Sequence, residues 1–537
     1  MKKICKHLAL PVMIVSLFAS CHKIDVPVTS ELTPNVFPQN SAQFIQASGP
    51  AYAALRGNFS VDYWFIQSLS SDEAILPARG GNWYDNQNYR ALHYHSWTKD
   101  NGWTNSNWNW LSVVIGTTNQ ALSILTQTMP EGSGKQTGLS ELRMVRAMAY
   151  FMMMDLYGNV PIDTAYGDFT PHTNVPRAQV FNFIESEVKA NLPNLSNVTG
   201  ITTYGRANRY TAFALLAKMY LNAEYYTGTA RYNDCVVACD SVINSGKYAL
   251  EPMSSYLRMF YPNNGPQMKE FIFAIPYDPA AGATPGTNGF QYHARYDLPR
   301  SMQKKYSLPF TPSAPESTLP VYYANFNDPN DVRNGQWLTG LQYNYNGTPL
   351  TVTTTKKGYD QTYTGSDGGT AFTYQVNLTP DILLRQDVTT YDCGNDEVAW
   401  NMGYRNIKFY PDSTSTSRNQ NNDVPVFRYS DILLMKAEAI LRGGATTGGQ
   451  TAVSLVNQLR ANRTTSPALS SITLDGIYAE RCRELAWETW HRNDMIRFGK
   501  YEGSWGFKTN TDTYRRIFPI PTAAMAVNPT LVQNPGY

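Results

Sequence analysis

The sequence predicts a mainly α-helical protein, with a TPR-like superhelical scaffold of helix pairs and a large loop-rich, partly β insertion. Two blocks of the chain, 40–250 and 426–537, carry apolar residues at helical spacing, arranged as helix, short loop, helix. Alanine recurs where helix axes would approach closely, as in tetratricopeptide-type proteins, although no strict repeat signature is present. Between the blocks, residues 251–425 lose this spacing and are rich in Pro, Gly, Asn, Tyr and Thr. Because this stretch is too long for one structureless loop, we expect ordered loops and short strands.

The N-terminus is typical of a secretory signal peptide. Residues 1–20 combine lysines with a short apolar run, Leu8 to Phe18, that is too short to span a bilayer. Ala19-Ser20-Cys21 resembles a lipobox, the site at which a bacterial lipoprotein is cleaved and its cysteine acylated. We therefore predict lipidation of Cys21 and a membrane anchor; the alternative is an ordinary signal peptide with an incidental cysteine. Residues 21–39 are aperiodic and predict a flexible tether.

One helix is predicted to form the centre of the fold. From Glu141 to Tyr157, apolar side chains follow one helical face and then cover more than one side, as in a helix packed between neighbours. Gly158 is predicted to be a left-handed C-cap, and Pro161 prevents the helix from resuming. The other segments predict helices at 39–56, 105–127, 176–192, 209–226, 232–244, 427–442, 449–463 and 475–498, and strands at 271–275 and 350–355.

Composition and motifs argue against several classes of function. Lys and Arg number 44 against 42 Asp and Glu, so no basic surface favours a nucleic-acid partner. Glu488-x-x-His491 has the spacing of a di-iron ligand pair but lacks a second such pair, and His93 and His95 lack a third ligand nearby. The nucleophile-elbow, phosphate-loop and dinucleotide motifs are absent. We predict no catalytic residue, metal or cofactor, although a glycosidase needs only two carboxylates and stays open.

Three blocks of sequence carry a family resemblance. These blocks are RAMAYFMMMDLYGNVPI (146–162), then SSDEAILPARGGNWYD with LHYHSWTKDNGW (70–103), and IYAERCRELAWETWHRNDMIRFGKY with the tail FPIPTAAMAVNPTLVQNPGY (477–537). Together with the lipobox, they resemble the SusD/RagB family over nearly the whole chain. On this resemblance, the acids and arginines of 480–497 lie on a structural helix and are expected to form buried ion pairs.

The resemblance implies a surface lipoprotein of the outer membrane that captures nutrient, chiefly oligosaccharide or polysaccharide, and is not an enzyme. It also implies a partner, a SusC-like TonB-dependent transporter that receives the ligand. Two alternatives stay open: a peptide-binding or structural lid of such a transporter, and a surface glycoside hydrolase.

The resemblance also places the loop-rich segments towards the ligand, here 62–103 and 290–346. A sugar ring stacks on an exposed indole or phenol, and its hydroxyls need charged or amide partners. The predicted ligand-binding residues are the aromatic and polar side chains Asp72, Arg79, Trp83, Tyr84, Trp103, Tyr292, Tyr296 and Trp337.

Overall fold

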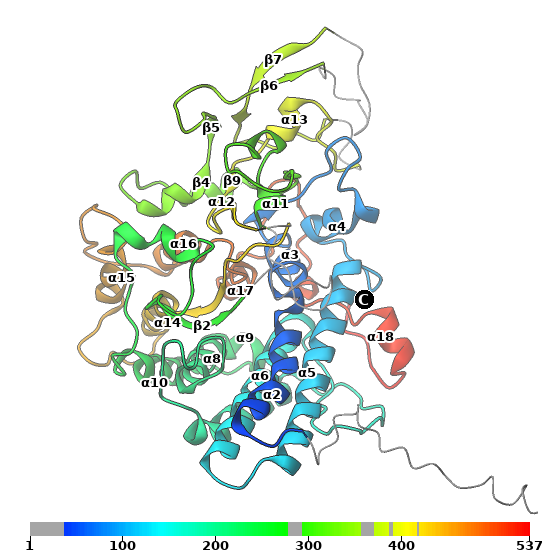
Figure 1. Cartoon of the computed structure of the whole chain (residues 1–537), viewed down its shortest axis with the longest axis vertical. Coiled ribbons are helices and arrows are strands. Elements are labelled where there is room, and N and C mark those ends of the chain that lie inside the picture. Colours follow the sequence, from blue (N-terminus) through cyan, green and yellow to red (C-terminus); the bar gives the residue numbers. More distant parts are fainter. Residues whose placement is uncertain (1–36, 278–292, 356–369, 386–389, 416–417) are drawn as a thin grey trace, which may run out of the picture.

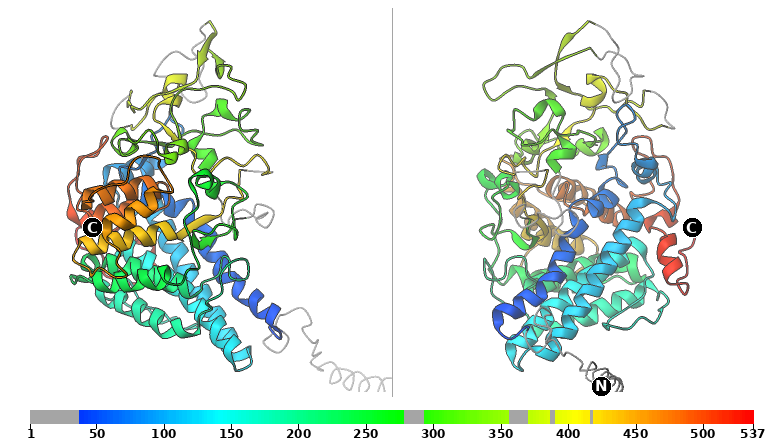
Figure 2. Two further views of the ribbon diagram at one scale, coloured as in Figure 1. Left: turned by 90° about the vertical axis from the view of Figure 1, so that its left-hand side faces the viewer. Right: turned by 45° about the vertical axis from the view of Figure 1, so that its right-hand side comes forward.

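The computed structural model describes residues 37–277, 293–355, 370–385, 390–415 and 418–537. The predicted signal peptide, the lipidation site Cys21 and the candidate Tyr292 lie outside these residues. The described chain is mainly helical, as predicted, with the long helices at one end and the short strands of the insertion at the other (Figures 1 and 2). No helix among the described residues combines the length and apolarity needed to cross a membrane.

The scaffold is a series of helices in which neighbours along the chain pack on one another. Its members are α2 (Ser41–Phe59), α5 (Gly102–Thr128), α6 (Ser133–Tyr157), α7 (Arg177–Asn191), α8 (Arg209–Leu221), α9 (Ala223–Thr227), α10 (Tyr232–Ile243), α14 (Tyr429–Leu441), α15 (Ala452–Arg460), α16 (Leu474–Leu485) and α17 (His491–Arg497). α2 packs on α5, α5 on α6 and α6 on α7; α8 packs on α10, α10 on α14, and α14 on α15 and α16. These pairwise contacts confirm the TPR-like arrangement.

α6 is the internal helix that the sequence predicts. Every residue from 139 to 157 except Arg143 is buried. The helix ends at Gly158, whose φ of 72° confirms the positive-φ cap, while its ψ of −94° lies outside the usual left-handed helical region. A Cβ at Gly158 would lie 3.3 Å from Cδ1 of Ile517. Glycine is therefore favoured at this position by both its backbone conformation and its packing.

Two segments predicted as single helices are each divided in two. The segment 209–226 forms α8 and α9, and between them Asn222 donates from its side chain to the carbonyl of Lys218 at 2.8 Å. The segment 475–498 forms α16 and α17, separated by residues in which Trp487 and Thr489 have φ values of 63° and 67°. The apolar spacing alone does not reveal these breaks, because it continues across both of them.

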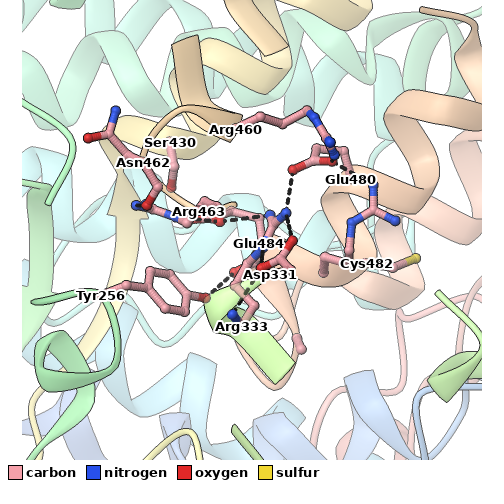
Figure 3. Close-up of polar contacts among 12 residues, drawn as sticks. Tyr256, Asp331, Arg333, Ser430, Arg460, Asn462, Arg463, Glu480, Cys482 and Glu484 are labelled. Carbon is pink, nitrogen blue, oxygen red and sulfur yellow. Dashed lines mark hydrogen bonds and ion pairs between the residues drawn. The ribbon is translucent and has the colours of Figure 1, made fainter. Parts of the chain in front are cut away.

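Buried cations support the end of α16. Lys408 Nζ donates to the carbonyls of Glu484 and Ala486, both at 2.9 Å, and Arg428 Nη2 donates to the Glu484 carbonyl at 2.8 Å. These charged donors satisfy carbonyl groups that the helix end leaves without intrahelical partners. The side chain of Glu484 belongs to the buried ion-pair network of Figure 3, as expected for the acids and arginines of this segment.

The strands form small antiparallel pairs instead of one sheet. In the described part of the chain the pairs are β1 (Ala74–Ile75) with β3 (Ser317–Thr318), β2 (Phe271–Ile275) with β10 (Val424–Arg428), β4 (Trp337–Leu338) with β9 (Arg405–Asn406), β5 (Gly340–Leu341) with β8 (Asn377–Leu378), and β6 (Thr351–Thr354) with β7 (Phe372–Gln375). β2 and β6 confirm the two predicted strands. β10 leads directly into α14, so this strand crosses the predicted boundary between 425 and 426.

The remaining helices are short. They include α3 (Asp62–Ser68), α4 (Asn88–Tyr94), α11 (His293–Asp297), α12 (Pro320–Tyr323) and α13 (Glu397–Asn401), with α18 (Thr522–Val527) near the C-terminus. The main apolar core runs from the scaffold into these short helices, and a second, small core around Leu298 and Met302 supports the insertion. α11 lies between them, because Tyr296 packs in the main core and Ala294 in the small one.

Candidate functional site

A tight glycine turn fixes the position of Trp83 in the loop-rich region. Gly80 and Gly81 have φ values of 63° and 80°, and their N–H groups donate to the two oxygens of Asp392 at 2.8 and 2.7 Å. Glycine adopts such positive φ values without the strain that a side chain would add. These two hydrogen bonds hold the turn against the distant segment that contains Asp392. The turn thereby fixes the backbone immediately before Trp83.

Trp83 belongs to a chain of ring contacts that we call the aromatic platform. Its members are Phe65, Trp83, Tyr89, Trp103 and Tyr296. Centroid distances are 5.3 Å for Trp83–Tyr296, 5.4 Å for Tyr296–Phe65, 5.0 Å for Phe65–Trp103 and 5.3 Å for Trp103–Tyr89. Trp83 and Trp103 are half-buried, and the other three rings are buried. The structure therefore brings together three of the predicted ligand-binding residues from two distant segments.

Two further side chains adjoin Trp83, Arg295 in space and Tyr84 along the chain. The guanidinium of Arg295 lies 5.6 Å from the Trp83 ring centroid and 5.5 Å from that of Tyr296, within the range of cation–π attraction. Tyr84 is 41% exposed, and its hydroxyl accepts a hydrogen bond from Gln87 at 2.5 Å. The half-buried Trp83 ring thus has a charged donor against it and is followed in the chain by an exposed phenol.

A pocket of about 300 Å³ lies between residues 299–301, which follow α11, the strand β6 and the helix α13. Its polar and aromatic lining includes Arg300, Asn395, Glu397, Trp400 and Asn401. The guanidinium of Arg300 lies 4.8 Å from the Trp400 ring centroid, and Trp400 Nε1 donates to Asn395 Oδ1 at 2.9 Å. The pocket lining begins at Pro299, two residues after α11 ends, so the pocket follows the platform residue Tyr296 closely along the chain.

The structure corrects three of the predicted ligand-binding residues. Arg79 is 0% exposed and its guanidinium donates to three backbone carbonyls, two of them in or next to α13, so it joins the glycine turn to that helix. Trp337 is buried and packs 5.4 Å from Trp487, edge to face. Asp72 is mostly buried and contacts His491 at 2.5 Å. Arg79 and Trp337 therefore present almost no surface to a ligand, and the Asp72 carboxylate is engaged inside the protein. Tyr296 is 8% exposed and presents as little surface as Trp337, so its role in the platform is to pack against the half-buried Trp83 ring.

Sequence reasoning missed Arg295, Arg300 and Trp400. All three lie in aperiodic stretches where periodicity carries no information about which side chains face outward. For Arg295 the sequence did contain a clue, because this residue directly precedes Tyr296, which was predicted to bind the ligand.

Cys482, His491 and Asp72 form a line of thiol, imidazole and carboxylate. Cys482 Sγ lies 3.8 Å from His491 Nδ1, and His491 Nε2 lies 2.5 Å from Asp72 Oδ1. This order resembles an activated nucleophile with its base and orienting acid. Cys482 is buried, however, and burial raises the pKa of its thiol, so the reactive thiolate is disfavoured and a substrate has no access. The arrangement supports a structural role.

The fold and the site define a TPR-like helical protein whose aromatic platform is built from four helices and a glycine turn. Two family models match this chain: one described as the SusD family over residues 214–537, and one described as "Starch-binding associating with outer membrane" over residues 52–221. The chain therefore belongs to the SusD family, as its sequence resemblance predicts.

Known relatives share most of its length. The starch-binding protein SusD of Bacteroides thetaiotaomicron is 23% identical over 492 residues, covering 87% of this chain and 84% of that protein. A solved laminarin-binding SusD-like protein superposes with a TM-score of 0.71 at 20% identity, covering 93% of this chain and all of the other. Surface glycan-binding protein A of Bacteroides thetaiotaomicron, solved with laminarihexaose, superposes with a TM-score of 0.67 at 19% identity, covering 92% and 99%. These structures establish the shared fold.

Proposed function

We propose that this protein captures oligosaccharide or polysaccharide at the cell surface, on the aromatic platform and the adjoining pocket. The observation that carries this proposal is the contact between Trp83 and Tyr296, which come from distant segments and are flanked by Arg295. An indole face stacks on the apolar face of a sugar ring, while guanidinium and amide groups suit its hydroxyls. The names of the relatives, which bind starch and laminarin, support carbohydrate as the ligand class.

Replacing Trp83 with alanine is expected to weaken glycan binding about tenfold to a hundredfold. Loss of a stacking partner costs roughly 1–3 kcal/mol when bases stack on aromatic side chains, and a sugar ring stacks on a comparable surface. The measurement is calorimetry of the chain without its signal and tether, against a panel that starts with maltoheptaose and laminarihexaose. Tyr166→Ala is the matched control, because Tyr166 is 56% exposed in the loop before α7.

The same experiment separates the alternative functions. Equal affinities of wild type, Trp83→Ala and Tyr166→Ala would remove the platform as the site. Binding of a peptide pool in the absence of any sugar binding would favour the peptide-binding lid. New reducing ends after long incubation, lost when two carboxylates are replaced, would make the protein a glycoside hydrolase.

The anchor and the partner complete the proposal. A lipid on Cys21 holds the protein at the outer membrane, and a SusC-like TonB-dependent transporter receives the glycan. The family description "associating with outer membrane" supports this location. A tagged chain that co-purifies from outer membranes with no TonB-dependent transporter would count against the partnership.

Cys21→Ala is expected to release the protein from membranes or leave it unprocessed. Acyl chains contribute roughly 0.8 kcal/mol for each methylene that they bury in the bilayer, and the variant cannot carry them. Membrane fractionation followed by mass spectrometry of the N-terminal peptide measures the effect. An unmodified Cys21 in a wild-type chain that still sediments with membranes would contradict lipidation.

A further inference from the structure

Three potential metal ligands meet at the helix that carries Arg295 and Tyr296. His293 and Asp297 lie one turn apart on α11, and Glu316 immediately precedes β3. One ligand atom of each lies within 4.8 Å of the others, and His293 Nδ1 is 3.8 Å from Asp297 Oδ2. All three side chains are buried. Neither the aromatic platform nor the pocket uses this cluster.

The carboxylate of Glu316 lies in this cluster without a hydrogen-bond donor. Glu316 is 0% exposed, and within the described residues neither of its oxygens accepts a hydrogen bond. The same holds for Oδ1 of Asp297. Buried carboxylates are strongly disfavoured unless they are paired or coordinate a metal. The cluster therefore needs either a further positive group or a proton shared by its two acids.

Arg405 supplies only part of that charge. It is buried and close enough to interact electrostatically with Asp297 and Glu316, but its Nη2 donates to the carbonyl of Trp400 at 2.9 Å. Its Nε and Nη1 make no hydrogen bond within the described residues. Two carboxylates against one guanidinium leave one negative charge without compensation. A bound cation or a proton shared by the two acids would balance it.

We propose that His293, Asp297 and Glu316 bind one divalent transition-metal ion. One imidazole nitrogen and two carboxylates are a ligand set that suits Zn²⁺ or Mn²⁺. Ca²⁺ takes six to eight oxygen ligands, and Mg²⁺ keeps several waters, so this small nitrogen-containing set suits them less. His293 also favours a metal over a shared proton. Two carboxyl groups can share a proton with no imidazole beside them, whereas a transition metal uses the imidazole as a ligand. Bonds to such an ion would be about 2.0–2.2 Å long.

The ion would fasten α11 to the segment that leads into β3. The backbone already joins these segments, since Glu316 N donates to the carbonyl of Tyr296 at 3.1 Å and Ser313 N to that of Arg295 at 2.7 Å. A metal adds a side-chain link at both ends of the same short helix. It thereby fixes the helix that supports the platform, whatever ligand the platform binds.

The test measures metal content and stability without any glycan. The purified chain is analysed by inductively coupled plasma mass spectrometry, then stripped with a chelator and titrated separately with Zn²⁺ and Mn²⁺. We expect about one equivalent of ion per chain, a melting temperature that falls on chelation, and recovery on adding one of the two ions. Glu316→Gln and Asp297→Asn should each lose the ion and the chelator effect.

Asp168→Asn is the matched control, because Asp168 lies 3.8 Å from His172 in an exposed histidine–aspartate cluster and should not affect metal content. A wild-type chain that contains no metal and takes up neither ion would overturn the proposal and leave the shared proton as the balancing charge. Ion retained equally by Glu316→Gln and Asp297→Asn would show adventitious binding elsewhere and would also overturn it. If neither variant folds, the titration of the stripped wild-type chain decides alone.

Discussion

Replacing Glu484 with alanine should lower the free energy of unfolding by about 3–5 kcal/mol, the cost found when a buried ion pair loses one partner. The Glu484 carboxylate is buried and accepts hydrogen bonds from three guanidiniums, those of Arg333 at 3.1 Å, Arg428 at 2.8 Å and Arg463 at 3.0 Å. Figure 3 shows Arg333 and Arg463 reaching Glu484 from different segments. Alanine would leave these charges with fewer carboxylates in a region that water does not reach.

The remaining acids limit the loss without removing it. Arg333 keeps its contact with Asp331 at 2.6 Å, and Arg463 keeps its contact with Glu270 at 2.5 Å. These acids each face fewer positive charges than Glu484 does, so they cannot compensate for all three arginines. We therefore expect the variant to fold, but with a large loss of stability.

Urea unfolding followed by circular dichroism measures this loss, with Asp475→Ala as the control on the same helix. Asp475 is exposed and pairs with Lys500 at 2.9 Å, and exposed pairs contribute about 0–1 kcal/mol. A loss in Glu484→Ala no larger than in Asp475→Ala would show that the network adds little to stability.

Periodicity was sufficient to predict the scaffold but not where its helices are interrupted. α6 follows from its apolar pattern and Gly158 because both causes are local. The break after Leu485 depends on Lys408 and Arg428, which are far away in the sequence and donate to carbonyls at the helix end. The spacing of apolar residues along the chain does not reveal contacts between segments that are far apart in the sequence.

The site was predicted in part for a similar reason. The family resemblance pointed to two segments, and the density of aromatic residues within them identified Trp83, Trp103 and Tyr296, which the structure brings into one platform. The same density also selected Trp337, because a buried indole and a surface indole look alike in sequence. Arg79 illustrates the opposite case, since an arginine is usually exposed, yet here its two terminal nitrogens donate to backbone carbonyls inside the protein.

The ion-pair network also makes the protein sensitive to acid through Glu480. Burial alone would raise the pKa of Glu480, but the charges of Arg333 and Arg483 outweigh it and bring the pKa to about 2, from an ordinary value of 4.5. Arg333 Nη2 lies 2.7 Å from Glu480 Oε1, and Arg483 Nη2 lies 2.5 Å from Oε2. Since the pKa is lower in the folded chain, the stabilisation is complete above pH 4.5 and is lost as pH falls towards 2.

The size of this contribution follows from the shift. One pKa unit corresponds to about 1.4 kcal/mol, so Glu480 contributes roughly 3 kcal/mol at neutral pH. Other acids act in the opposite direction: burial raises the pKa of Glu73, whose protonation favours the folded state as pH falls. The free energy of unfolding of the wild type, measured against pH, therefore contains stabilising and destabilising contributions from different acids. The difference between the wild type and a Glu480 variant isolates the contribution of Glu480.

We expect the stability difference between wild type and Glu480→Gln to shrink by about 2 kcal/mol between pH 6 and pH 3, because glutamine keeps the shape and hydrogen-bonding capacity but cannot titrate. Urea unfolding at pH 6, 5, 4 and 3 measures it. Glu131→Gln is the control, because Glu131 is exposed beside Lys135 and its difference from wild type should stay small and nearly constant. A difference for Glu480→Gln that is equally constant across this range would show that Arg333 and Arg483 do not hold the carboxylate in its ionised form.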